Sequence, residues 1–492
     1  MDEKLTEPDE IVRRLSAHAE WLVVRENGDS SAVNANEIEI GLRHGRMLFG
    51  FLDDRGFRLF RMQSCRAGDN ELAFDVTAQF GRTREIIRLV PRTSAAELAR
   101  HLEIARLERA AEIAAAIDRN YDQVKLIRVA LNAENGRLAE IILEEKGGDR
   151  IAVFADVTES LTAETLLATA LLRVDRFRMR SKKRIAQLWL AGPKKQARAL
   201  QKLVALLRSG ARSDIRVLLL DQTKDAACIE LKNLRLTDLW REKPKKLMLP
   251  DVIEITDTAR RIVAISPDNI DVINSKQGET VRFRGLACAR VRNLLGREKA
   301  WFGVDRERRP LTEDTRADLA ALIHSLGKYR RADTEYRRHR YFITSPESWL
   351  ESILRRNIKL LDANLILSPL YNQFRTSNDK IDLLALRRDG RLVIIELKTS
   401  PDREMIFQAA DYWRKIEMQR RRGNLAKARV FGELEILDKP SLVYCVAPAL
   451  SFHRDFEYFA RKLAPEIELW RFELHEKWRE GIKVIARKNY SE

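Results

Sequence analysis

The sequence has few of the patterns that build disulfide-rich, zinc-binding or membrane proteins. Its four cysteines form no CxxC pair, and its seven histidines form no HxxxH spacing. Scattered thiols of this kind favour a reducing compartment, with neither a disulfide framework nor a zinc site. No apolar run approaches the ~18 residues of a membrane span, and the first residues are polar with no apolar leader. We therefore expect a soluble cytoplasmic protein that has no membrane partner.

Positive charge is what the chain has in excess. It holds 90 Lys and Arg against 73 Asp and Glu, which gives a formal net charge of +17. A field of that sign attracts and retains phosphates, so the composition predicts a polyanionic partner. The alternative is a basic surface that is merely well solvated. With 492 residues, the chain is long enough for several domains that each bury a core.

One stretch near the C-terminal end, residues 380–399, places charge inside an apolar run. Residues 381–386 and 392–398 are typical of two strands, joined by the tight-turn dipeptide Asp389-Gly390. Because side chains alternate along a strand, Glu396 and Lys398 should share one face. The hairpin would bring Asp382 close to Glu396.

Two buried carboxylates and an ammonium cost several kcal/mol of desolvation per ion unless something compensates. A divalent cation held by Asp382 and Glu396 would do so. The alternative is an edge strand with a Glu-Lys pair in water.

The flanking segments read as helices, and each contributes further polar residues. Residues 346–361 follow the start signal Ser345-Pro346 and carry Glu351, while residues 404–420 carry Gln408 and Tyr412. In order, these motifs read ESWLESIL, KIDLLAL, VIIELK and QAADY. Together they resemble the PD-(D/E)xK nuclease superfamily, in particular its RecB-like and mismatch-endonuclease-like branches, over roughly the last 150 residues. Ile381 stands where the name-giving proline of the family would be.

The resemblance implies a hydrolase that cleaves DNA and depends on Mg²⁺ or Mn²⁺. It implies that Asp382, Glu396 and the Leu397 carbonyl, with Glu351, hold the metal. It also implies that Lys398 orients the attacking water and stabilises the transition state, supported by Gln408 and Tyr412. A competing hypothesis is a nucleic-acid-binding scaffold whose nuclease fold has decayed.

The N-terminal half repeats the same order of elements. Residues 94–240 read as helix, three strands, helix, strand, helix and strand, as do residues 343–492. The last helix of the second region is expected over residues 452–463. A gapless alignment of Arg150 on Arg391 places Ile141, Ala155 and Val157 on Asp382, Glu396 and Lys398, which predicts a degenerate copy without a metal site. Another register uses Glu144-Glu145-Lys146 as the ExK motif, but it leaves no acidic partner. Two unrelated α/β domains remain the alternative.

Each of these regions follows a segment rich in short strands. We therefore predict a mixed α/β chain with two restriction-endonuclease-like domains, the first degenerate, each preceded by a small β-rich domain. The expected boundaries are residues 1–93, 94–240, 241–342 and 343–492. The third segment begins with a basic linker, residues 241–246, and includes the expected strands RRIVAI, NIDVIN and ETVRFR.

The segment 328–342 interleaves aromatic and basic residues directly before the nuclease-like region. Basic side chains pair with phosphates, and aromatic rings stack on unpaired bases. A solvated connecting helix is the alternative. The candidate nucleic-acid contacts are Arg330, Tyr336, Arg337, Arg338 and Arg340.

Overall fold

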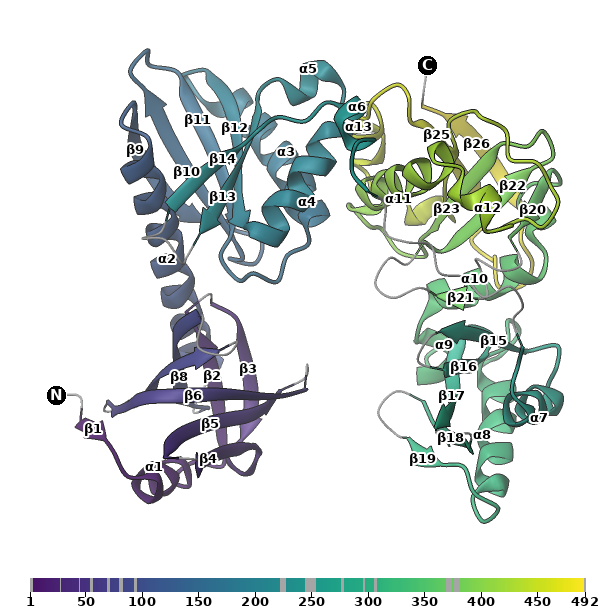
Figure 1. Ribbon diagram of the computed structural model, residues 1–492, viewed down its shortest axis with the longest axis horizontal. Helices are drawn as coiled ribbons and strands as arrows, with labels where there is room; N and C mark the ends of the chain where they lie inside the picture. The colour runs from purple at the N-terminus through teal and green to yellow at the C-terminus, as the bar shows by residue number, and fades with distance from the viewer. Residues whose placement is uncertain are drawn as a thin grey trace. The chain divides into compact units, whose positions relative to one another are not determined.

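A computed structural model describes most of the chain. The described residues are 3–26, 28–43, 45–53, 56–68, 71–78, 83–92, 95–221, 227–243, 254–275, 278–294, 297–304, 308–368, 374–375 and 381–490. They form two compact units, one made of residues 1–204 and 212–233 and the other of residues 205–211 and 234–492. Each contains two sheets (Figure 1). No helix in the described ranges is long and apolar enough to cross a membrane.

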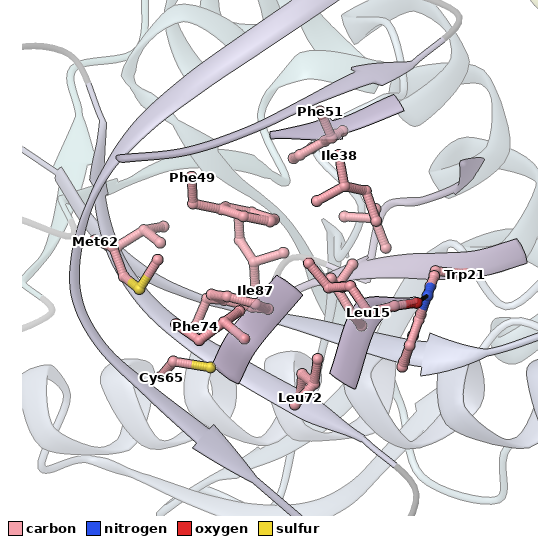
Figure 2. Close-up of a cluster of buried hydrophobic side chains, with 14 of the residues drawn as sticks. Leu15, Trp21, Ile38, Phe49, Phe51, Met62, Cys65, Leu72, Phe74 and Ile87 are labelled. Carbon is pink, nitrogen blue, oxygen red and sulfur yellow. Dashed lines mark hydrogen bonds between the residues drawn. The ribbon is translucent and has the colours of Figure 1, made fainter. Parts of the chain in front are cut away.

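The first unit begins with a meandering antiparallel sheet of strand order β3-β2-β8-β7-β6-β5-β4, with β1 paired to β6. Helix α1 (Pro8–Leu15) buries Ile11 and Leu15 against it. Alternate side chains of the strands face the core, where Phe49 stacks on Phe74 with ring centroids 4.4 Å apart (Figure 2). The strands are β1 (Glu3–Leu5), β2 (Glu20–Arg25), β3 (Ser30–Asn34), β4 (Ile38–Arg43), β5 (Arg46–Asp53), β6 (Gly56–Ala67), β7 (Leu72–Ala78) and β8 (Thr83–Pro91).

The first α/β domain has the sheet order β9-β10-β11-β12-β13-β14. Helix α2 packs apolar residues at helical spacing, from Ala110 to Ile117, on one face of this sheet. Helix α3 covers the other face, where Phe177 stacks on Phe154. The elements are α2 (Ala95–Asn120), β9 (Val124–Leu131), β10 (Leu138–Glu145), β11 (Arg150–Asp156), α3 (Ala163–Arg180), β12 (Ile185–Pro193), α4 (Lys194–Ala205), β13 (Ile215–Asp221) and β14 (Ala227–Leu231). Helix α6 (Leu236–Leu239) and most of α5 (Ser209–Arg212) belong to the second unit.

The second β-rich domain is a smaller meander between two helices, in the order β19-β18-β17-β16-β15-β21. The strand prediction for RRIVAI is wrong, because these residues belong to helix α7. The Thr256 hydroxyl accepts the Ala259 N–H and caps that helix. The elements are α7 (Asp257–Ile265), β15 (Ile270–Ser275), β16 (Gly278–Phe283), β17 (Leu286–Leu294), β18 (Arg297–Phe302), β19 (Arg309–Pro310), α8 (Arg316–Tyr329) and α9 (Arg340–Ile343). Part of the linker, residues 244–246, lies outside the described residues.

The second α/β domain has the sheet order β20-β22-β23-β24-β25-β26. Helix α10 and the apolar residues of β22 and β23 form its core, with Trp349 and Leu397 at the centre. The elements are α10 (Pro346–Arg356), η3 (Ile358–Leu360), β20 (Leu365–Leu367), β22 (Leu383–Arg387), β23 (Leu392–Leu397), α11 (Met405–Arg421), α12 (Asn424–Lys427), β24 (Leu442–Pro448), η4 (Ala449–Ser451), α13 (Phe456–Ala460), β25 (Glu468–Leu474) and β26 (Val484–Asn489). Strand β21 (Phe374–Arg375) lies between β20 and β22 in the chain but pairs with β15 in the sheet of the β-rich domain.

The two α/β sheets have the same topology. In each, the first three strands pair antiparallel, the next two pairings are parallel, and the last is antiparallel. The predicted fold class, a mixed α/β chain with several sheets, is confirmed. One predicted helix is largely wrong, since residues 452–463 form a helix only over Phe456–Ala460.

Candidate active site

The hairpin of β22 and β23 is the frame of the site. Its strands pair antiparallel from Leu386 opposite Leu392 to Leu383 opposite Ile395. At the turn, the Gly390 N–H donates to the Arg387 carbonyl at 2.8 Å, and Gly390 has a φ of +81°, which favours glycine. Continuing this register places Asp382 across from Glu396 at the open end of the hairpin.

Asp382 is held there by the neighbouring strand. One of its carboxylate oxygens, Oδ2, accepts the Leu397 backbone N–H at 2.9 Å. This bond fixes the carboxylate beside the Glu396-Leu397 peptide, as the sequence predicted.

Glu396 is buried, with 3% of its surface exposed. Its Oε1 lies 3.2 Å from the Lys398 ammonium, while Oε2 is buried and has no hydrogen-bond partner among the described residues. Burial raises the pKa of the Glu396 carboxyl well above its ordinary value, and the Asp382 charge adds to the rise, whereas Lys398 opposes it. The site therefore contains a carboxylate whose charge is only partly compensated.

Lys398 bridges two carboxylates. Its Nζ lies 3.2 Å from Glu396 Oε1 and 3.0 Å from Asp402 Oδ2. Burial alone would lower the pKa of the ammonium, but Glu396, Asp402 and Glu347 together raise it above the ordinary value. Lys398 is thus held as a cation. The other Asp402 oxygen accepts the Glu404 N–H, which fixes Asp402 at the start of α11.

Gln408 and Tyr412 lie on α11, which packs on β23 and β24. Their spacing of four residues places them one turn apart on one face, and both side chains are half-buried. The Lys415 ammonium lies 5.4 Å from the centroid of the Tyr412 ring.

The predicted metal ligand Glu351 is engaged elsewhere. Both of its carboxylate oxygens lie 3.3 Å from Arg282 Nη1, and Arg282 also pairs with Asp271. All of this cluster is within the second unit, where it joins β16 to α10. To bind a metal, Glu351 would have to break its ion pair with the buried Arg282.

Glu347, one helical turn earlier, is the acidic residue of α10 whose charge reaches the site. It contributes to raising the pKa of both Glu396 and Lys398. It is not among the site residues predicted from the sequence. A signal was available, since Glu347 and Glu351 are four residues apart and share a helix face.

The segment 328–342 differs in part from its prediction. Arg330 as a nucleic-acid contact is wrong, because its guanidinium is fully buried and donates to the carbonyls of Arg284, Tyr341, Thr344 and Ser345. Burial, with Arg479 nearby, lowers its pKa to about 9.

The other candidate contacts in this segment are exposed: Tyr336, Arg337, Arg338 and Arg340. Tyr336 makes an edge contact with Tyr329, and Arg340 Nη2 donates to the Tyr341 hydroxyl at 3.2 Å.

The corresponding positions of the first α/β domain hold a closed ion pair. The hairpin turns of the two domains match with Gly148 on Gly390, since both donate to a carbonyl three residues earlier and both have positive φ. This match places Glu140 on Asp382, Phe154 on Glu396 and Asp156 on Lys398. The predicted register is therefore wrong by one residue, although Ile141, Ala155 and Val157 are fully buried core residues as predicted.

Glu140 accepts two hydrogen bonds from Arg173 of α3, at 2.6 and 2.7 Å. Asp156 accepts the backbone N–H groups of Thr158 and Leu161, and so closes the loop before α3. Glu144, of the alternative register, pairs with Lys183 at 2.7 Å near the surface.

The described residues contain no group of three or more His, Cys, Asp or Glu side chains close enough to hold a metal. Asp382 and Glu396 form a pair. Mg²⁺ is commonly held by one or two carboxylates, with water and substrate phosphate completing its shell, so a pair is compatible with that ion.

No family model matches the chain, and no curated protein matches it. Two solved structures are similar over part of it. EndoMS in its apo form shares 11% identity and covers 39% of this chain and 88% of its own, with a TM-score of 0.14. A repair endonuclease from Pyrococcus abyssi shares 12% identity and covers 41% of this chain and 94% of its own, also at 0.14. At these TM-scores, neither structure establishes the fold of this chain.

Proposed function

We propose that the second α/β domain hydrolyses phosphodiester bonds of DNA with the help of Mg²⁺ or Mn²⁺. The observation that carries this proposal is the buried Oε2 of Glu396, which has no partner among the described residues and lies on a carboxylate beside Asp382 and Lys398. A buried charge left half-compensated is costly, and active sites are where such arrangements occur.

The residues present fit a hard divalent cation. Asp382 and Glu396 would supply carboxylate oxygens and Leu397 a backbone carbonyl, with Glu347 close enough to add negative charge. A cation bound there would offset the energetic cost of burying Glu396. When bound, it supplies an acidified water and neutralises charge that develops on the phosphate.

The chain's own cation is Lys398. Its ammonium is fixed between Glu396 and Asp402, on the same strand face as Glu396. There it would donate a hydrogen bond to the attacking water or to a phosphate oxygen, a role that suits a compact, mobile point charge. Asp402 would still hold the Lys398 ammonium when Glu396 binds a cation. Gln408 and Tyr412 would support the site from α11.

The net charge of +17 supports a nucleic-acid substrate. Lysine and arginine contacts release condensed counterions from the phosphates, so affinity should fall steeply with salt. The exposed residues Tyr336, Arg337, Arg338 and Arg340 would contribute to binding. An unchanged affinity between low and physiological salt would favour a protein partner instead.

The competing function is a nucleic-acid-binding scaffold that does not cleave. The first α/β domain has Phe154 at the position of Glu396 and Asp156 at the position of Lys398, so it lacks the Asp-Glu-Lys trio, and its Glu140 is closed off by Arg173. The second domain differs in keeping Asp382, Glu396 and Lys398 together.

The deciding experiment is cleavage of linear, nicked, flapped and single-stranded DNA with Mg²⁺, Mn²⁺ or EDTA. We expect cleavage with either metal and none with EDTA. The isosteric variant Glu396→Gln should lose at least about a hundredfold in rate while it still folds and binds DNA. The exposed Glu433→Gln is the matched control, since Glu433 is 86% exposed and should be unaffected. Cleavage by Glu396→Gln at the wild-type rate would refute the assignment.

A further inference from the structure

The two α/β domains differ in how the chain leaves the fourth strand of the sheet. In the first domain, β12 passes directly into α4, a helix of 12 residues. In the second, β24 leads into η4 and a loop, and α13 has only 5 residues. We call residues 449–455 the rim loop.

The rim loop is not an insertion. Ala191 of β12 pairs with Ala155, and Val446 of β24 pairs with Leu397, which is the position matching Ala155. Counted from Ala191 and Val446, helices α4 and α13 end after the same number of residues, at Ala205 and Ala460. The first turns of the helix have therefore been replaced by a loop only in the domain that carries Asp382, Glu396 and Lys398.

The loop is anchored beside the proposed active site. The Ser451 hydroxyl donates to the carbonyl of Thr399, the residue after Lys398, at 3.0 Å. The Leu450 N–H donates to Glu476 Oε1 at 2.8 Å. Phe452 and Phe456 pack edge to face, with the Arg471 guanidinium over both rings. These contacts fix the backbone against the end of β23.

Although its backbone is fixed, the loop exposes one large apolar and one cationic side chain. Leu450 is 80% exposed, and the Arg454 side chain is 75% exposed. Such a pair matches a nucleic-acid strand, which presents phosphates and the apolar faces of sugars and bases.

His453 adds a hydrogen-bond donor to the same loop. Its Nδ1 accepts the Asp455 N–H at 3.2 Å, so the neutral ring carries its hydrogen on Nε2. Within the described part of the chain, Nε2 has no hydrogen-bond partner. Burial lowers the pKa of His453. The charges of Asp455 and Asp402 raise this pKa, and those of Arg403 and Arg454 lower it further, so the ring lies among charged groups of the rim loop and of the segment that follows Lys398.

We propose that the rim loop contacts the DNA strand at the active site. Arg454 and the Nε2–H of His453 bind a phosphate next to the scissile one, and Leu450 packs on the adjoining sugar or base. The inference rests on the proposed function for its substrate, but it concerns binding and can be measured without cleavage.

The test is the affinity of the full-length chain for fluorescently labelled DNA, single-stranded and duplex, measured by anisotropy in EDTA over a range of salt concentrations. Arg454→Ala should weaken binding about tenfold and reduce the salt slope by about one ion. Leu450→Ala should weaken binding several-fold and leave the slope unchanged, because it removes apolar contact only. The matched controls are Arg461→Ala, at an arginine 71% exposed beyond the loop, and Leu434→Ala, at a leucine 48% exposed; both should bind as wild type.

Wild-type affinity and slope in both rim-loop variants would overturn the inference and leave the proposed nuclease intact. DNA that is bound through the loop but never cut with any metal would refute the nuclease and retain the loop contact. A wild-type chain that binds no DNA would refute both.

Discussion

The two α/β domains share one sheet topology but treat a buried carboxylate at the open end of the hairpin differently. In the first domain, Glu140 is closed off by the two N–H groups of Arg173. In the second, Glu396 has one oxygen on Lys398 and the other without a partner among the described residues. Both oxygens of Glu140 therefore have a partner within the protein, whereas only one oxygen of Glu396 has a partner among the described residues.

In this fold, a structural ion pair and a candidate site differ in the cation that lies beside the carboxylate. A guanidinium satisfies both oxygens of a carboxylate in a fixed geometry and leaves neither oxygen without a partner. A lysine satisfies one oxygen and leaves the other available. The helix after the fourth strand differs between the domains as well. In the first domain, α4 has 12 residues, whereas in the second, α13 has only 5.

The largest effect should separate the two glutamates of α10. Glu347→Gln should reduce cleavage about a hundredfold, because it removes negative charge that would help to hold a divalent cation beside Glu396. Glu351→Gln should leave the cleavage rate close to wild type and lower the melting temperature, since it weakens the pair with Arg282. Single-turnover rates with Mn²⁺ and thermal melts measure both. The reverse pattern would favour Glu351 as a ligand of the proposed metal site.

A smaller effect is expected from opening the closed pair of the first domain. Glu140→Leu should destabilise the first unit by about 2 kcal/mol, because it leaves the partly buried Arg173 without its carboxylate. Urea unfolding measures this loss. The double variant Glu140→Leu with Arg173→Met is the matched control and should recover most of the stability. Cleavage should be unchanged in both, and its loss without a loss of stability would give the first domain a catalytic role.

The smallest effect should come from the alternative ExK register. Glu144→Ala with Lys146→Ala should leave cleavage unchanged. The pKa of Glu144 is lowered by its hydrogen bond to Lys183, with the charges of Lys183 and Arg150 adding. A lowered pKa stabilises the fold above the ordinary glutamate value, and this contribution is lost as pH falls through the folded value. Urea unfolding of wild type and variant should therefore differ slightly at neutral pH and converge in acid. A cleavage defect in this variant would favour Glu144-Glu145-Lys146 as the ExK motif.

Much of the second domain followed from its sequence. The Asp389-Gly390 turn and the alternation of Glu396 and Lys398 are local features, and the structure places Asp382, Glu396 and Lys398 together. The register of the first domain did not follow. Strands β10 and β11 are buried on both faces, so their apolar pattern does not reveal which side faces α2.

Other errors arose from distant partners. Arg330 reads as a surface cation in the sequence, and its burial depends on carbonyls brought together by the fold. Glu351 reads as a site residue until Arg282 is seen beside it. The predicted helix over residues 452–463 has helical composition, and the loop that replaces its first half is held by Thr399 and Glu476.

The buried guanidinium of Arg330 also bears on how this architecture could have been inherited. Arg330 belongs to the β-rich domain, and it holds the carbonyls of Thr344 and Ser345 at the start of α10, where a side chain at Gly285 would collide with the Ser348 carbonyl. A recombination breakpoint at residue 343 would therefore separate Arg330 from the Thr344 and Ser345 carbonyls that it binds. The second β-rich domain and the α/β domain that follows it would have to be exchanged as one piece.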